Sequence, residues 1–386
     1  MKRIVVAFCF LLILPLALLS AATYRVPSQF ATIQAAINAL APYPGDTVLV
    51  APGAYGGPSV EEVAVSISGR NGLTLLSESG RESTTIQWNW HGTIDIRGSI
   101  NCKIAGFTIM SAGGPGLTIA GCSNIDILDC RICECSQGLV TGNASNVQIL
   151  NNIIDLNSNG IEFSVNGPYF CANNDVFNNA FGITTHSFSG LAPLNVTIDG
   201  NHIHGNSQAG ILLTASSESN SADNIWINGN LIYQNPGCGV KVNSAAATNI
   251  LNNTIAANIM SGIHLTSQCR YSTLFITGNI IALNDYAGIV ADVTANPCIS
   301  CNDVYANARF ANGNYIGFIT DQTGYNGNIS SDPFFCDASA GDYSLAANSL
   351  ALLASCGPMG AIPTPGCSAQ TPVEHTTWGG IKALYR

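Results

Sequence analysis

Charged residues are scarce in this chain of 386 residues, where Asp, Glu, Lys and Arg together make up only 9%. The shortage is greatest for basic residues: 13 Lys and Arg stand against 23 Asp and Glu, and the formal net charge is −10. Such a chain repels nucleic acids and anionic membrane surfaces, so we expect no nucleic-acid partner. Hydrophobic residues make up 47%, which is enough to build a continuous core.

Long apolar runs are also lacking, except at the start of the chain. Lys2 and Arg3 precede an apolar run from Ile4 to Leu19, and small residues follow up to Ala22. This pattern is typical of a secretory signal peptide that is cleaved after Ala22. The run is shorter than the roughly 20 residues that a membrane-spanning helix needs. We therefore expect a secreted or cell-envelope protein with no membrane insertion after the signal is removed.

Histidine is rare as well, with 6 residues, and this limits what the 14 cysteines can do. The pairs Cys130/Cys133 and Cys298/Cys301 have a C-x-x-C spacing that can hold a metal ion, but no cluster of histidines accompanies them. We predict no metal site. In an oxidising compartment disulfides are the default fate of cysteine, and the 13 cysteines left after cleavage include at least one without a partner.

A repeat in a single register is the strongest positive signal in the sequence. It is marked by an aliphatic residue that recurs mostly every 22 or 23 residues. Asn stands two positions before this residue in seven successive repeats, and three positions after it in the same seven. The aliphatic positions are Ile109, Ile132, Ile154, Val176, Ile203, Ile232, Ile255, Ile281 and Val304. The two Asn columns are Asn152, Asn174, Asn201, Asn230, Asn253, Asn279 and Asn302, and Asn157, Asn179, Asn206, Asn235, Asn258, Asn284 and Asn307.

Asn at fixed places in every repeat indicates a turn that stacks on itself. Asn tolerates left-handed backbone angles and bonds to its own main chain. Stacked coils bring identical amides together at roughly 4.8 Å, where they can hydrogen-bond to one another. Cys130 and Cys135 occupy the same two columns one repeat earlier, where we expect both ladders to begin.

The residues between the turns read as short alternating strands. The residue five positions before the repeating aliphatic is almost always Ile, and a Gly-Ile-x-aliphatic pattern such as Gly210-Ile211 follows the second turn. Frequent Asn, Gly and β-branched residues argue against a helical repeat. The sequence therefore predicts an all-β solenoid, a single-stranded parallel β-helix with three strands per coil and about 22–29 residues per coil.

Both ends of such a solenoid need a cap. Phe30, Ile33, Ile37 and Leu40 recur at helical spacing and predict a capping helix. The expected organisation is a signal peptide over 1–22, an N-terminal cap over 23–46, the parallel β-helix over 47–330, a last coil and closure over 331–367, and a flexible tail over 368–386. We expect a local disulfide between Cys356 and Cys367.

The chain resembles right-handed parallel β-helix repeat proteins of the pectate-lyase-like superfamily over roughly residues 23–367. The resemblance lies in the segment from Phe30 to Ile37, the coil from Ile104 to Ile109, the Asn columns and the closing Asp332-Pro333-Phe334. It implies a right-handed solenoid and a carbohydrate partner. Members include lyases, hydrolases, esterases, epimerases and non-catalytic surface proteins, so it implies no single reaction.

The three longest connections follow Gly182, Gly210 and Gly262 and leave the same turn, which suggests a binding face there. Polar side chains on the outward positions of that strand could supply a base and a cation. The candidate catalytic residues are Lys241, His264, Arg270, Glu162 and His186. The alternative is that each is an ordinary solvated side chain. We find no carboxylate cluster for calcium and no facing carboxylate pair for a hydrolase, so we expect no cofactor, with calcium as the alternative.

Three aromatic residues, Phe170, Trp226 and Phe275, occupy one outward column on alternate coils. They could act as stacking platforms for a sugar chain, unless the long loops cover them. Few cations accompany them, so a neutral polysaccharide fits better than a polyanionic one. We therefore expect a monomer that binds extracellular polysaccharide on the long-loop face. The alternatives are a polysaccharide lyase or related carbohydrate-active enzyme, and a structural envelope protein or adhesin.

Overall fold

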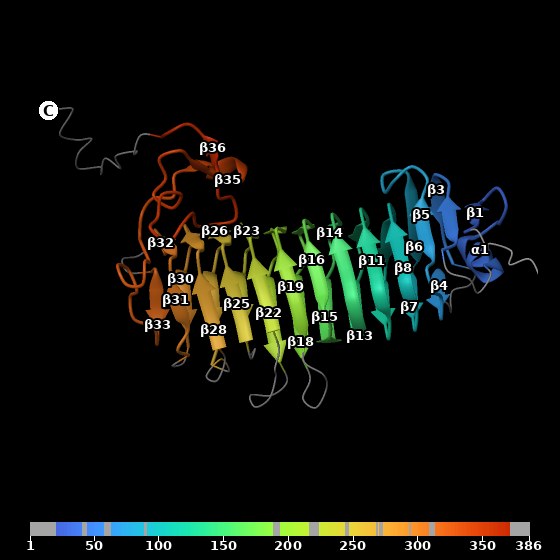
Figure 1. Cartoon of the computed structure of the whole chain (residues 1–386), viewed down its shortest axis with the longest axis horizontal. Coiled ribbons are helices and arrows are strands. Elements are labelled where there is room, and N and C mark those ends of the chain that lie inside the picture. The colour runs from blue at the N-terminus through green and yellow to red at the C-terminus, as the bar shows by residue number, and fades with distance from the viewer. Residues whose placement is uncertain are drawn as a thin grey trace, which may run out of the picture.

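The computed structural model shows one long stack of β-strand coils (Figure 1). It describes residues 21–40, 45–57, 63–88, 91–187, 194–215, 224–243, 247–267, 269, 273–292, 295–308 and 313–370. The expected signal peptide up to residue 20 and the tail from residue 371 lie outside these ranges. Among the described residues, no helix has the length and apolar character needed to cross a bilayer.

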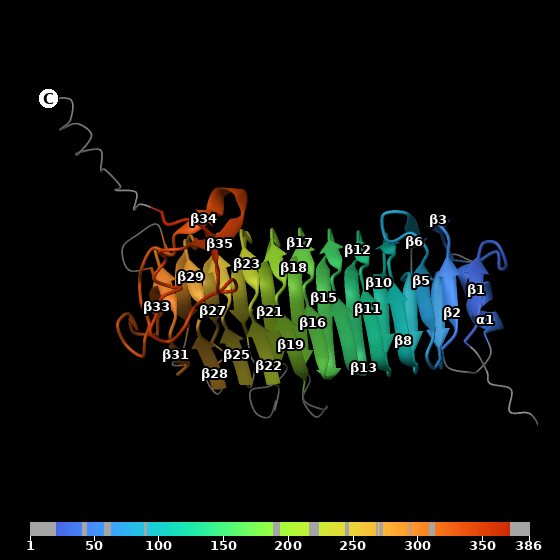
Figure 2. The ribbon, with the colours of Figure 1, turned by 45° about the horizontal axis from the view of Figure 1, so that its top comes forward.

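Three parallel sheets run along the stack, and successive coils add one strand to each (Figures 1 and 2). Sheet A contains β1 (Thr23–Val26), β2 (Thr47–Val50), β5 (Thr74–Ser77), β8 (Ile100–Ala105), β11 (Ser123–Leu128), β16 (Tyr169–Ala172), β19 (Asn195–Asp199), β22 (Asn224–Asn228), β25 (Ala247–Leu251), β28 (Thr273–Thr277) and β31 (Cys298–Ser300). Sheet B contains β3 (Gly53–Tyr55), β6 (Thr84–Trp88), β9 (Thr108–Ser111), β12 (Arg131–Cys133), β14 (Ile153–Asp155), β17 (Asp175–Phe177), β20 (His202–His204), β23 (Leu231–Tyr233), β26 (Thr254–Ala256), β29 (Ile280–Ala282) and β32 (Asp303–Tyr305). Sheet C contains β4 (Val65–Ser68), β7 (Ile94–Arg97), β10 (Pro115–Ala120), β15 (Asn159–Asn166), β18 (Phe181–Ser187), β21 (Ala209–Ala215), β24 (Cys238–Val242), β27 (Ser261–Leu265), β30 (Ala287–Ala291) and β33 (Tyr315–Gly317).

One strand, β13 (Gln137–Leu150), runs from sheet C into sheet A without a break. The predicted parallel β-helix is thus confirmed. Its interior is filled by the inward aliphatic columns, and their members Ile127, Ile149, Ile198 and Ile227 are fully buried. Because each coil buries its apolar face only against its neighbours, the stack is stable as a whole and not coil by coil.

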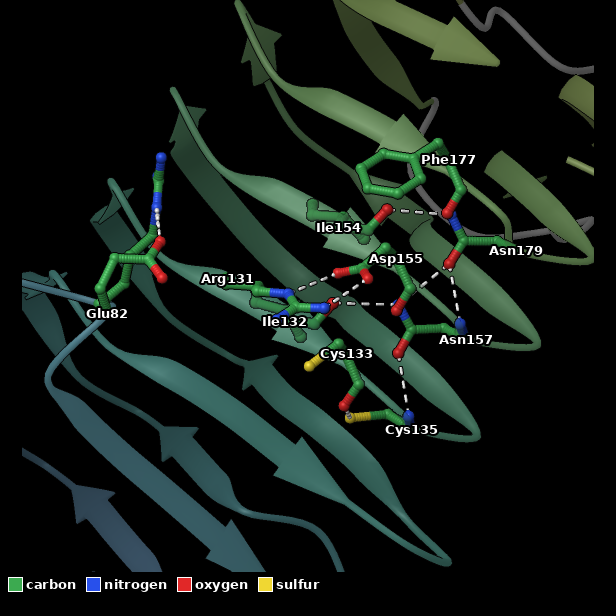
Figure 3. Close-up of polar contacts among 11 residues, drawn as sticks. Glu82, Arg131, Ile132, Cys133, Cys135, Ile154, Asp155, Asn157, Phe177 and Asn179 are labelled. Carbon is green, nitrogen blue, oxygen red and sulfur yellow. Dashed lines mark hydrogen bonds and ion pairs between the residues drawn. The ribbon is translucent and has the colours of Figure 1, made fainter. Parts of the chain in front are cut away.

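Both Asn columns form the predicted ladders. In the first, the amide of each Asn donates to Oδ1 of the next, as from Asn201 to Asn230 at 2.9 Å. The second begins at Cys135, whose backbone N–H donates to Asn157, and Asn157 donates in turn to Asn179 (Figure 3). The ladder residues are buried. In each, the side-chain oxygen accepts hydrogen bonds and the side-chain nitrogen donates them, as a buried polar group requires.

The turns differ from the expectation in one respect. The left-handed backbone conformation belongs to the residue before each ladder Asn and not to the ladder Asn itself. Asn173, Gly200 and Gly229 have φ values of 55°, 61° and 63° directly before Asn174, Asn201 and Asn230. The ladder amide is thereby turned inward, where it bonds to the neighbouring coils.

The N-terminal helix is present as α1 (Ile33–Ala39), with Thr32 as N-cap accepting a hydrogen bond from the backbone N–H of Ala35 at 3.1 Å. Ile33, Ala36 and Ile37 are buried, so the amphipathic spacing places the expected face on the solenoid. The strand β1 beside it already pairs in parallel with β2.

The C-terminal region does not form the expected last coil. Strands β34 (Phe335–Asp337) and β35 (Asp342–Ala346) pair antiparallel, and β36 (Pro365–Cys367) joins them in a separate small sheet. This C-terminal unit, residues 331–370, folds back over the outer face of sheet B, beside β23 and β26 (Figure 1). It buries apolar side chains such as Leu231 and Ile280 that would otherwise be exposed on that face.

The expected Cys356–Cys367 disulfide is wrong. Cys356 pairs with Cys301 in the solenoid, and Cys367 pairs with Cys336. The C-terminal unit folds back over the solenoid and so brings Cys356 next to Cys301, which lies 55 residues earlier in the sequence.

Disulfide formation as the default is also wrong for most described cysteines, since nine are free and eight of these are buried. They act as small apolar residues in the core. Cys171, for example, takes the place of an inward Ile, and burial raises the pKa of its thiol to about 12.

Candidate functional site

The ring column is the name used below for Phe170, Trp226 and Phe275 on the outer face of sheet A. The strand register aligns them in one row with Thr197 and Asn249 between them, in the order Phe170, Thr197, Trp226, Asn249, Phe275. The residues are 38%, 39% and 42% exposed, so the rings are open to solvent. At the strand spacing, adjacent rings lie about 9.6 Å apart along the axis.

The central ring of this row is held in place. The indole N–H of Trp226 donates to Oδ1 of Asn224 at 2.8 Å, two residues earlier on β22. The residues between the rings, Thr197 and Asn249, are half-buried and carry a hydroxyl and an amide. The row therefore alternates apolar surface with hydrogen-bonding groups.

A second group lies on the outer face of sheet C. Lys241 on β24 pairs directly with His264 on β27, and Nε2 of His264 lies 3.1 Å from Oδ2 of Asp292. The exposed side-chain fractions of His264 and Asp292 are 22% and 44%. Lys241, His264 and Asp292 are called the sheet C group below. Arg270 and most residues of the three long connections lie outside the described residues.

Glu162 and His186 do not come together with this group. Glu162 pairs with Thr184, and its carboxylate accepts hydrogen bonds from Gln137 at 3.1 Å and Asn159 at 3.0 Å. His186 stands in the neighbouring column, with Nδ1 at 3.4 Å from the Thr214 hydroxyl. Glu162 is therefore held by amides, and in the described part of the chain its carboxylate forms no hydrogen bond with an imidazole.

Cys269 lies close to the sheet C group, since its thiol bonds to the residue that follows Lys241, but it offers no nucleophile. It is fully buried, and its thiol donates to the carbonyl oxygen of Val242 at 2.9 Å. Burial raises the pKa of Cys269 to about 11, so the thiol stays protonated at neutral pH.

The polar groups on sheet B are structural. Arg131 and Asp155 form a two-armed ion pair between adjacent coils, at 3.0 and 2.8 Å (Figure 3). The hydrogen bonds that Arg131 donates to Asp155 raise the pKa of Arg131 above its ordinary value. Both carboxylate oxygens of the buried Asp155 accept a hydrogen bond from Arg131. The ion pair therefore joins one coil to the next.

Asp175 pairs in register with His202, but its carboxylate bonds to His204 at 3.0 Å instead. The His204 ring is stacked between Phe177 and Tyr233, with centroids 5.1 and 4.9 Å away. Tyr233 in turn contacts Tyr343 of the C-terminal unit. This stack anchors the C-terminal unit to sheet B.

Two family models match the sequence. One, described as a right handed beta helix region, matches residues 64–226, and the other, described as a periplasmic copper-binding protein (NosD), matches residues 195–331. No curated protein has a matching sequence.

Several solved structures have a similar fold. A pectate lyase superposes with a TM-score of 0.59 at 15% identity, covering 89% of this chain and 96% of that one. The A-module of the Azotobacter vinelandii mannuronan C-5 epimerase AlgE6 gives 0.57 at 18%, covering 78% and 94%. An alginate lyase from a Paenibacillus species gives 0.53 at 16%, covering 80% and 99%. The chain is a right-handed parallel β-helix protein of the pectate-lyase-like fold. At these identities the likeness establishes the fold of this β-helix protein and not its reaction.

The description of the second family raises the question of a copper site. Copper is held in proteins by imidazole, thiolate or thioether groups that converge on one point. In the described part of this β-helix protein, no three side chains of His, Cys, Asp or Glu converge in this way. Burial also raises the pKa of Cys238 and Cys269 within the matched segment, which opposes thiolate formation. The described His, Cys, Asp and Glu side chains do not fit a copper centre.

Two features of the site were missed at the level of sequence. Asp292 bonds to the His264 imidazole, and this bond runs diagonally between two columns of outward side chains. Phe318, 65% exposed, follows the strand β33 that pairs with β30, and its N–H donates to Ala291 next to Asp292. An aromatic residue directly after a strand of sheet C, such as Phe318, is a sequence signal for an exposed ring near the sheet C group.

Proposed function

We propose that this protein is exported and binds a neutral extracellular polysaccharide along the ring column. The observation that carries the proposal is the row itself: three exposed rings in strict register on one face of a rigid solenoid. Aromatic rings present large, rigid contact area at little cost in side-chain entropy. The solved structures of similar fold include enzymes named for pectate, mannuronan and alginate, which are polysaccharides. The two disulfides and the periplasmic description of one matching family support export.

The charge of the surface favours a neutral chain over a polyuronate. The column on sheet A around the rings carries Gln148, Thr197 and Asn249, and none of the five column positions from Phe170 to Phe275 is basic. A polyanion would have to approach an acidic protein without fixed cations at the point of contact. A neutral chain meets no such repulsion.

Replacing Trp226 by alanine should weaken binding to a responsive polysaccharide by about tenfold or more, because the central ring offers the largest contact area of the row. The measurement is affinity electrophoresis or calorimetry with the mature protein, after a glycan array has identified the ligand.

Tyr286→Ala is the matched control for this experiment. Tyr286 is 54% exposed, but it lies outside the ring column. Its removal should leave affinity unchanged, and both variants should melt at the wild-type temperature. Unchanged affinity in Trp226→Ala would refute the proposed binding surface, and an array without any hit would favour the structural or adhesive alternative.

The sheet C group supports a second candidate, a polysaccharide lyase or related carbohydrate-active enzyme. The carboxylate of Asp292 orients the His264 imidazole, and the Lys241 ammonium is one coil away. An imidazole held in this way can take or deliver a proton, and a nearby cation can stabilise the negative charge that develops on the substrate.

Incubation with a polysaccharide panel, with and without calcium, separates the two candidates. The enzyme predicts new reducing ends or unsaturated products, a loss of at least about 100-fold in rate for His264→Ala, and a smaller loss for Asp292→Asn. Glu162→Gln should keep the full rate, because its carboxylate is not part of this group. Binding without any product would remove the enzyme and leave the binding proposal intact.

A further inference from the structure

The spacing of the ring column carries information about the shape of the glycan, given that the proposed function holds. The rings occupy every second coil, and the coils between them present Thr197 and Asn249 at the same position across the sheet. Two coils advance about 9.6 Å along the axis. This distance is close to the length of a disaccharide in an extended chain, so a glycan lying along the axis advances about one sugar per coil.

We infer that the ligand is a flat β-(1→4)-linked glycan with a two-sugar repeat, of the cellulose, mannan or chitin backbone type. In such a ribbon each sugar is turned over relative to its neighbours, so every second sugar presents the same face. Rings on every second coil then meet identical faces. The sugars between them present the opposite face, flanked by hydroxyl groups at the edges of the ribbon, to which Thr197 and Asn249 can donate and from which they can accept hydrogen bonds.

Glycans that coil do not fit this row. In an α-(1→4)-glucan or a β-(1→3)-glucan the sugar faces rotate progressively along a curved path, so a straight row with a two-coil period meets a matching face only once. The row is straight because the strand pairs are in register from Phe170 to Phe275. Trp226 is also pre-oriented by its bond to Asn224, so little ordering is needed on binding.

The row further sets the length of the binding site. Phe170 to Phe275 spans five coils, so a pentasaccharide is the shortest chain that contacts all three rings. We expect affinity for cello- or manno-oligosaccharides to rise from the trimer to the pentamer and then to level off. Malto- and laminari-pentaose should bind at least about tenfold more weakly than the ribbon pentamers.

A rearranged row tests the period itself. The double variant Thr197→Trp with Trp226→Thr keeps the number of rings but moves the central ring by one coil, so that the gaps become one and three coils. It should lose ribbon-pentamer affinity by at least about tenfold, as Trp226→Ala does. Tyr286→Ala remains the control, and melting curves show whether each variant is folded.

The outcomes separate this inference from the proposed function. Equal or tighter binding of maltopentaose or laminaripentaose, or wild-type affinity in the rearranged row, would overturn the ribbon and leave polysaccharide binding standing. An affinity that does not grow beyond the disaccharide would also overturn it. No binding by any glycan of the panel would overturn both.

Discussion

Replacing Asn230 by alanine should lower the free energy of unfolding by about 4 kcal/mol or more. Its amide donates to the carbonyl oxygens of Ile198 and Asn228 and to Oδ1 of Asn253, each at 2.9 Å. Its own Oδ1 accepts from the backbone and side-chain nitrogens of Asn201, also at 2.9 Å. The side chain is fully buried. The loss is large because alanine leaves several buried partners unpaired, at roughly 1–3 kcal/mol each.

Guanidinium denaturation followed by circular dichroism measures this loss, and Asn228→Ala is its matched control. Asn228 lies on the same coil, but its side chain is only half-buried and its amide donates to Asp199 at 2.6 Å near the surface. We expect that control to cost about 1 kcal/mol or less. Similar losses in the two variants would show that the ladder does not stabilise the stack beyond an ordinary surface amide.

The ladder also explains why so much of the fold could be predicted. One register rule, read from the Asn and Ile columns, fixes which residues face inward and which stack on adjacent coils. The same rule places Phe170, Trp226 and Phe275 in one row, and the strand pairing agrees. A repeat converts a long-range structure into a local pattern, because every contact between coils recurs at nearly the same sequence separation.

Contacts that do not recur with the repeat could not be predicted from the sequence. The Cys301–Cys356 disulfide depends on the C-terminal unit returning over sheet B, where no periodic pattern guides it. The bond between His264 and Asp292 depends on two side chains leaning diagonally across the strands, which the register alone does not determine. The buried free cysteines were misread because export suggests disulfides, although inward positions such as that of Cys171 favour a small apolar side chain.

Stability should fall as the pH rises from about 4 to about 7, and Asp303→Asn should remove much of this fall. Asp303 is fully buried under the C-terminal unit. One carboxylate oxygen accepts from the backbone N–H of Ser331 at 3.0 Å, and the other has no partner among the described residues. Burial, with a smaller contribution from Asp332, raises the pKa of Asp303 from 3.8 to about 7.

The sign follows from proton binding. Between the unfolded and folded pKa values, the folded protein keeps a proton that the unfolded chain has lost, so stability declines with pH across this window and is constant above it. The raised pKa sets the full decline on the order of 4 kcal/mol. Asparagine imitates the protonated carboxyl. At pH 8 the variant should therefore be more stable than the wild type by on the order of 4 kcal/mol, and at pH 5 this difference should shrink to about 1–2 kcal/mol.

Asp155→Asn provides the opposite case and makes the test specific. Asp155 is also buried, but both of its oxygens are paired with Arg131, so its charge is compensated. Neutralising it should destabilise the protein at pH 8 by roughly 1–3 kcal/mol, because Arg131 loses its partner. Denaturation curves of both variants at pH 5, 6, 7 and 8 give the comparison. The prediction is wrong if Asp303→Asn destabilises the protein at pH 8 as Asp155→Asn does. That result would mean that the Asp303 carboxylate is ionised and paired with a positive group or hydrogen-bond donors in the folded protein.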